Sequence, residues 1–150
     1  MTVILQSFIK RSDLKSNPNV KYLFGDNLAR KGLGGQAKEM RNEPNAIGIA
    51  TKKFPSLDEK SFFTDNEYED NIAQIKLDLE PAFNHLENGG ILVIPQDGLG
   101  TGLSKLKEKA PKTNAFLEDQ INKLINLKKN KTPRIPPLNF KGSFPKKILY

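Results

Sequence analysis

The chain has 150 residues, with 24 Lys and Arg against 17 Asp and Glu, so its formal net charge is +7. This length is typical of one domain that buries a substantial core. The absence of cysteine excludes disulfides, a cysteine nucleophile and thiolate metal sites, and a single histidine excludes a multi-histidine metal site. We expect no metal site and no cofactor.

The basic charge is concentrated at the C-terminal end. Residues 129–150 contain six basic residues and no acidic residue, so residues 1–128 carry a formal charge of only +1. Four prolines in the same segment exclude a regular helix, and its apolar residues indicate packing against the rest of the chain. We therefore predict a domain over residues 1–128, followed by a basic, proline-rich tail (129–150) that is partly packed on it.

No stretch approaches the roughly 20 apolar residues that a membrane helix needs. The first residues lack the small-residue cleavage pattern of a signal peptide. We expect a cytoplasmic location without membrane contact, and the sequence indicates no particular oligomeric state.

Short apolar runs predict strands over residues 3–9, 20–24, 46–51 and 91–94. Residues 12–18 are polar and predict a loop, whereas residues 36–41 predict a short helix. The spacing of Thr64 and Glu67 is that of a capping box, which predicts a helix start ahead of an apolar stripe over residues 72–86. Pro81 within this stripe predicts a kink or a division of the helix. Further helices are expected from Leu103 to about residue 110 and from Asn114 to Leu127.

This alternation of strands and helices predicts an α/β fold, a three-layer α/β/α sandwich with a mixed, mostly parallel central sheet. Ligands in such sheets bind beyond the carboxyl ends of the strands. Two glycine-rich loops are expected there, one at residues 32–35 and one at residues 98–102. Both follow a strand and precede a helix, so their backbone N–H groups are suited to a diphosphate. The alternative is that both are tight turns.

Four polar side chains follow the same strand ends. Asp26 and Asn27 are suited to ribose hydroxyls, or alternatively to capping a turn. Lys52 is the candidate nucleophile or electrostatic group, since partial burial lowers the pKa of an amine, although Lys52 could instead be a surface lysine. Asp97 is the acid or base candidate nearest the second loop, with a turn residue as its alternative.

These motifs resemble those of macrodomains, the ADP-ribose-binding fold. Asn27 with Gly32–Leu33–Gly34–Gly35–Gln36–Ala37 is similar to the asparagine and glycine-rich loop beside the terminal ribose, and residues 95–103 are similar to the diphosphate loop. The chain is most similar to DarG-type antitoxin macrodomains and their ADP-ribosyl-glutamate glycohydrolase relatives, in which a strand ends in P-T-K. Here the corresponding residues are Ala50–Thr51–Lys52.

The resemblance implies that Lys52 attacks or stabilises the anomeric carbon of ADP-ribose. The glutamate-directed relatives place an aspartate just after the second loop, where this chain has Ser104. This departs from their two-residue mechanism and leaves a mechanism that uses lysine alone as an open alternative. We assign catalysis to Lys52 and Asp97. We assign ligand binding to Asp26, Asn27, Gly32, Gly34, Gly35, Thr51, Gly98, Leu99, Gly100, Thr101, Gly102 and Leu103.

The sequence favours removal of ADP-ribose from a modified macromolecule, either DNA or protein, by cleavage of a glycosidic bond. One alternative is a binding module for ADP-ribose or a related nucleotide without turnover, which the basic tail docks to nucleic acid or protein. Another is a nucleic-acid-associated protein in which the tail alone contacts phosphates.

Overall fold

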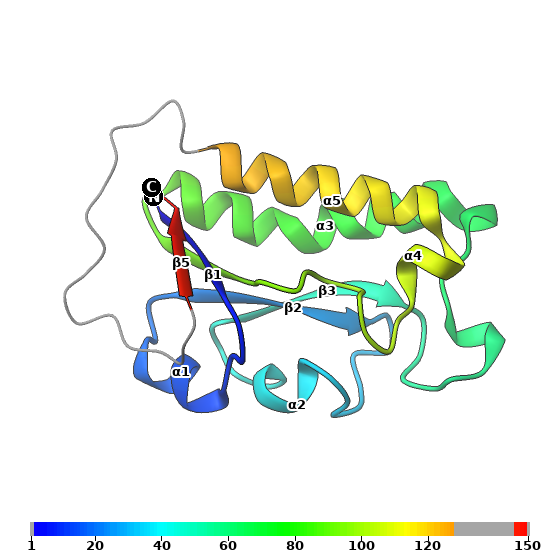
Figure 1. Cartoon of the computed structure of the whole chain (residues 1–150), viewed down its shortest axis with the longest axis horizontal. Helices are drawn as coiled ribbons and strands as arrows, with labels where there is room; N and C mark the ends of the chain where they lie inside the picture. Colours follow the sequence, from blue (N-terminus) through cyan, green and yellow to red (C-terminus); the bar gives the residue numbers. More distant parts are fainter. Residues whose placement is uncertain (1, 128–145, 150) are drawn as a thin grey trace.

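The computed structural model describes residues 2–127 and 146–149 (Figure 1). Within these residues five strands form one sheet in the order β3-β2-β4-β1-β5. The strands β1, β2, β3 and β4 pair in parallel, and β5 pairs antiparallel with β1 at one edge. The strands are β1 (Thr2–Gln6), β2 (Lys21–Asn27), β3 (Ala46–Lys52), β4 (Ile91–Pro95) and β5 (Lys146–Leu149).

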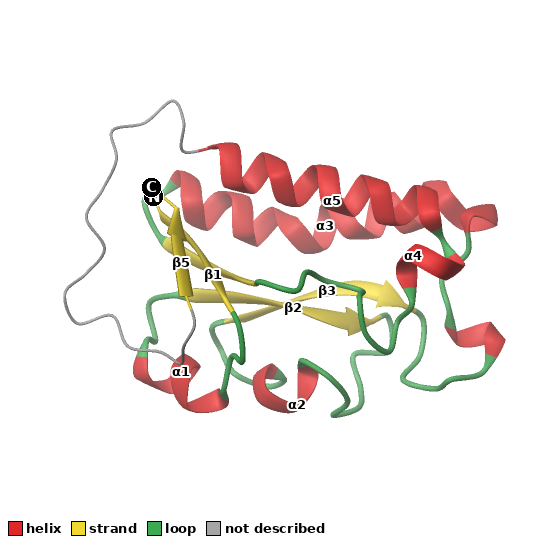
Figure 2. Ribbon diagram, in the orientation of Figure 1, coloured by secondary structure: helices red, strands yellow, loops and turns green. Residues whose placement is uncertain are grey.

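Helices cover both faces of the sheet, which confirms the predicted three-layer α/β/α sandwich with a mixed, mostly parallel sheet. The two long helices lie on one side and two short helices on the other (Figure 2). The α-helices are α1 (Arg11–Ser16), α2 (Ala37–Met40), α3 (Tyr68–Glu87), α4 (Leu106–Lys109) and α5 (Pro111–Asn126), with 3-10 turns η1 (Glu59–Ser61) and η2 (Asp65–Glu67). None of the described helices is both long enough and apolar enough to span a membrane.

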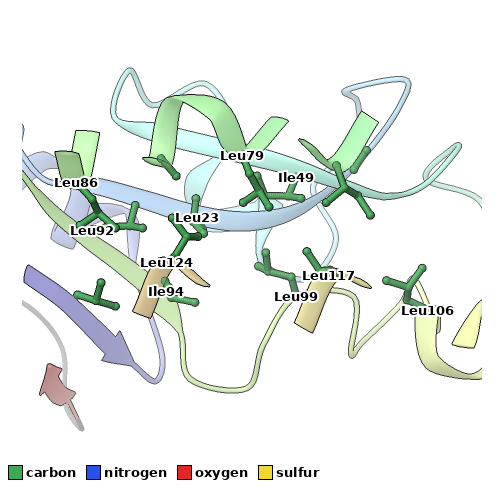
Figure 3. Close-up of a cluster of buried hydrophobic side chains, with 14 of the residues drawn as sticks. Leu23, Ile49, Leu79, Leu86, Leu92, Ile94, Leu99, Leu106, Leu117 and Leu124 are labelled. Atoms are coloured by element: carbon green, nitrogen blue, oxygen red, sulfur yellow. The ribbon is translucent and has the colours of Figure 1, made fainter. Parts of the chain in front are cut away.

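Successive strand residues point to opposite faces of the sheet, and both faces are buried. Leu23 and Leu92 belong to the larger apolar cluster, which also holds Leu79 of α3 and Leu117 of α5 (Figure 3). The neighbouring Val93 points the other way, into the cluster beneath α1 and α2. Burial on both faces explains why the strands appear in the sequence as continuous apolar runs.

Three helix boundaries differ from the prediction. Residues 12–18 contain most of α1, which is too short and has too few apolar residues to show a helical period. Thr64 precedes the 3-10 turn η2 and makes no side-chain cap, so α3 begins only at Tyr68. Pro81 does not divide α3, which is assigned as one helix from Tyr68 to Glu87; the proline is exposed.

The two helices after the second glycine loop also begin elsewhere. The first was expected from Leu103, but α4 begins at Leu106 because residues 102–105 form a turn closed by the Lys105 N–H and the Gly102 carbonyl. The last helix starts at Pro111 instead of Asn114. Proline suits the first helical position, where its N–H would have no helical acceptor.

The predicted tail lies mostly outside the described residues. Its described part is β5, which runs antiparallel to β1 with Ile148 opposite Ile4. This strand was not expected from the sequence.

Candidate functional site

A cavity of about 290 Å³ lies at the carboxyl ends of β2 and β3. Its other walls are two loops, which we call the first glycine loop (residues 31–36) and the second glycine loop (residues 97–104). The volume is near the lower end of the range for small-molecule sites, roughly 300–1,000 Å³. Parallel strand ends and loops of this kind are where open α/β sheets bind ligands.

Both loops line the cavity and contain backbone N–H groups that make no hydrogen bond with any described residue. In the described part of the chain, the N–H groups of residues 32–36 donate to no protein acceptor. The same holds for residues 100–103 of the second loop. Unpaired N–H groups on two sides of a hollow form a site for an anion.

Gln36 fixes the second loop relative to the sheet. Its Oε1 accepts from the Gly25 N–H at 2.7 Å, and its Nε2 donates to the Gly98 carbonyl at 3.0 Å. A Cβ on Gly25 would lie 3.5 Å from both Gln36 Oε1 and the Gly100 nitrogen. The end of β2, the first loop and the second loop are therefore closely packed around one amide.

Arg41 fixes the first loop. Its guanidinium pairs with the buried Asp26 carboxylate, while Nε donates to the Gly32 carbonyl at 2.7 Å and Nη2 to the Lys31 carbonyl at 3.1 Å. Arg30 lies 3.6 Å from the same carboxylate. Asp26 lines the cavity, but its charge is offset by two arginines and its main role is to anchor the loop.

Gly48 of β3 leaves room for this carboxylate. A Cβ at Gly48 would lie 2.6 Å from Asp26 Oδ2. Glycine within a strand often allows such a close approach of a neighbouring group.

Lys52 lies at the end of β3 and is only 6% exposed. Its Nζ donates to the Ser56 carbonyl at 2.8 Å and lies 4.8 Å from the centroid of the Phe62 ring. Burial, together with the nearby charge of Lys105, lowers the pKa of Lys52. Lys52 is therefore a cavity residue with a perturbed amine, and not an ordinary surface lysine.

The structure brings all of the predicted site residues to this cavity except Gly98 and Leu99. Gly98 is excluded as a donor because its N–H bonds to the Pro95 carbonyl. The Leu99 side chain is buried in the larger core cluster (Figure 3). The lining residues are Asp26, Asn27, Gly32, Gly34, Gly35, Thr51, Lys52, Asp97, Gly100, Thr101, Gly102 and Leu103.

The two other polar side chains expected at the site, those of Asn27 and Asp97, also line the cavity. Asn27 Nδ2 donates to the Lys31 carbonyl at 2.8 Å and so closes the turn that leads into the first loop. It thereby fills the turn-capping role and lines the cavity as well. Asp97 is exposed at the cavity edge.

No group of three or more His, Asp or Glu side chains in residues 2–127 and 146–149 is placed to hold a metal ion.

A comparison with family models gives one match, over residues 4–120, to a family of unknown function, DUF7831. The chain belongs to the DUF7831 family. No curated protein and no solved structure matches the chain. The matched region contains every cavity residue of this DUF7831 member and stops before the basic tail.

Arg41 and Gln36 shape the site of this DUF7831 protein, but neither was expected there from the sequence. Gln36 lies inside the glycine-rich motif, directly after Gly35, and this position could have indicated a role at the site. Arg41 has no such signal. Its neighbours in the sequence do not distinguish it from an ordinary surface arginine at the end of a short helix.

Proposed function

We propose that the chain binds ADP-ribose in the cavity between the two glycine loops and removes it from a modified DNA or protein. The observation that carries this proposal is the arrangement of unpaired N–H groups from both loops around one hollow, with the buried Lys52 in its wall. The macrodomain resemblance of the same loops supports ADP-ribose as the diphosphate ligand. Lys31 and Arg41 add positive charge to the lining.

In this mechanism the loops hold the diphosphate, so that binding energy places the anomeric carbon of the terminal ribose beside Lys52. The unprotonated amine attacks that carbon, and the electron pair of the broken bond leaves with the acceptor, which takes the proton. Water then releases the ribose from the lysine and restores the amine. The lowered pKa of Lys52 favours the unprotonated form that this step needs.

A second candidate is a module that binds ADP-ribose without turnover. The contacts of Lys52 favour it, because both the Ser56 carbonyl and the face of the Phe62 ring stabilise an ammonium group. In this case the basic tail would dock the module to nucleic acid or to another protein.

The test is incubation of the full chain with ADP-ribosylated DNA and ADP-ribosylated protein, with measurement of released ADP-ribose. We expect release from at least one substrate by the wild type and none by Lys52→Ala. The matched control is Lys53→Ala, because Lys53 is the adjacent lysine, pairs with Glu67 at 2.6 Å and does not line the cavity. Full release by Lys52→Ala would overturn the mechanism, and saturable binding without release would favour the module.

A further inference from the structure

A short segment after β3 closes one edge of the cavity. We call residues 54–57 the strap, which contains no helix or strand. Pro55 lines the cavity, and a Cβ added to Gly32 would lie 2.8 Å from Pro55 Cβ, so the strap packs against the first glycine loop. The strap therefore forms the cavity wall between that loop and Lys52.

The strap itself is loosely packed between two fixed ends. None of its four side chains is buried, with Phe54 52% exposed and Leu57 66% exposed. Segments with so few buried apolar contacts open at a low cost in free energy. The flanking residues are fixed, because the Lys53 N–H donates to the Ser61 carbonyl at 2.7 Å and the Phe62 side chain is buried.

One side chain connects the strap to the sheet. With the described residues, the strap makes two hydrogen bonds. One joins the Asp58 N–H to Ser56 Oγ at 3.0 Å and is local. The other runs from Lys52 Nζ to the Ser56 carbonyl at 2.8 Å. Within the described chain, Lys52 is therefore the one hydrogen-bonded link between the strap and the sheet.

The bond that anchors the strap also occupies the reacting group of the proposed mechanism. The Ser56 carbonyl and the Phe62 ring, whose centroid lies 4.8 Å from Lys52 Nζ, both favour the ammonium form. An ammonium group has no lone pair with which to attack. The amine must therefore leave the Ser56 carbonyl before it acts, and the strap then loses its anchor.

Release of the strap would also give a ligand more room. The cavity of about 290 Å³ is near the lower end of the range for small-molecule sites, and Pro55 forms part of its wall. Movement of Pro55 away from Gly32 would enlarge the cavity beside Lys52, where the proposed mechanism places the ribose.

We propose that Lys52 anchors the strap as well as reacting with the ligand, so that a ligand that takes the Lys52 amine releases the strap and widens the cavity. Because one bond serves both roles, the coupling is reciprocal: loosening the strap frees the amine, and engaging the amine frees the strap. The inference rests on the proposed function for the identity of that ligand, ADP-ribose.

The first measurement follows the motion of the strap without any ligand. The chain has no cysteine, so Leu57→Cys carries a nitroxide spin label at a single exposed position. Lys52→Met removes the amine and keeps an unbranched apolar side chain. We expect it to shift the electron paramagnetic resonance spectrum toward the narrow lines of nanosecond loop motion. The control is Lys60→Met, because Lys60 is exposed and makes no hydrogen bond or ion pair with a described residue.

The second measurement tests the coupling in the reverse direction. Pro55→Gly removes the packing against Gly32 and the fixed φ of proline, so the strap should loosen. The freed Lys52 amine should then react with acetic anhydride about fivefold faster, at the lower end of the usual range of coupling. Mass spectrometry of the digested protein gives the rate. Lys123 of α5, whose side chain is 62% exposed, is the internal reference.

An unchanged label spectrum in Lys52→Met would overturn the inference, as would an equal shift in Lys60→Met. Equal acetylation of Lys52 in Pro55→Gly and the wild type would overturn it as well. An excess of ADP-ribose should shift the wild-type spectrum in the same direction as Lys52→Met. If both variants behave as expected and ADP-ribose gives no shift, the anchoring role of Lys52 stands and the proposed function fails.

Discussion

The guanidinium of Arg41 pairs with the carboxylate of Asp26, with Nη1 at 3.3 Å from Oδ2 and Nη2 bonded to Oδ1. The two side chains are nearly buried, and the same guanidinium holds the carbonyls of Lys31 and Gly32. An ion pair between two side chains outside the first glycine loop therefore fixes the position of that loop.

Replacing Arg41 with Lys should loosen this loop, because an ammonium group cannot reproduce the planar fork that bonds Asp26 and both carbonyls. We expect ADP-ribose affinity to fall by about tenfold and the free energy of unfolding to fall by about 1–3 kcal/mol. Calorimetry and urea denaturation measure the two effects. Lys109→Gln is the control, since Lys109 pairs with Glu59 at 2.9 Å and does not line the first cavity. Unchanged affinity in Arg41→Lys would contradict the role assigned to Arg41.

Replacing Gln36 with Glu should displace the second glycine loop. A carboxylate can still accept from the Gly25 N–H, but it repels the Gly98 carbonyl to which Nε2 now donates. We expect weaker ADP-ribose binding, and chemical-shift changes in residues 97–104 of the free protein measured by NMR. A spectrum of that loop identical to wild type would show that Gln36 does not hold it.

The activity should rise with pH through the lowered pKa of Lys52, because the attacking amine must be unprotonated. Lys105→Gln removes a positive charge that favours the neutral amine, so it should raise this pKa and shift the activity profile to higher pH. The pH dependence of kcat/KM for the two proteins measures the shift. A profile that falls as pH rises would exclude the nucleophilic amine.

Two glycines of the second loop should respond differently to alanine. Gly100 has a φ of 76°, and a Cβ there would lie 3.0 Å from Leu106 Cβ, so Gly100→Ala should distort the loop and weaken ADP-ribose binding. Gly102 has no atom within 4 Å of an added Cβ and no positive φ. Gly102→Ala should therefore keep the thermal stability of wild type. Any loss of ADP-ribose affinity in this variant would then come from contact between the added methyl group and the bound ligand. A Gly100→Ala protein with wild-type affinity would argue against the loop as the diphosphate site.

The features that could be predicted from the sequence are the strands and the edge of the sheet at which the site lies, because both depend on local patterns of apolar residues. The apolar run before Pro95 and the run ending at Lys52 are strands buried on both faces, and parallel strands necessarily bring their carboxyl ends to one edge. Lys52 and the glycine loops could therefore be placed at one site before the structure was known.

The remaining features depend on tertiary contacts that no local pattern encodes. The glycine spacing indicated free N–H groups but did not reveal that the Gly98 N–H closes a turn with Pro95. The pairing of Asp26 with Arg41 joins residues on different elements, and the bond from Lys52 to the Ser56 carbonyl depends on the path of the strap. Asp26 itself was expected at the site from the sequence, but these tertiary contacts were not.

The most direct test of the central claim is a crystal structure of the full chain with ADP-ribose. We predict the diphosphate between the two glycine loops, with the anomeric carbon of the terminal ribose against Lys52 Nζ. A structure at saturating ADP-ribose in which this cavity is empty, or in which the ligand lies elsewhere on the protein, would contradict the account.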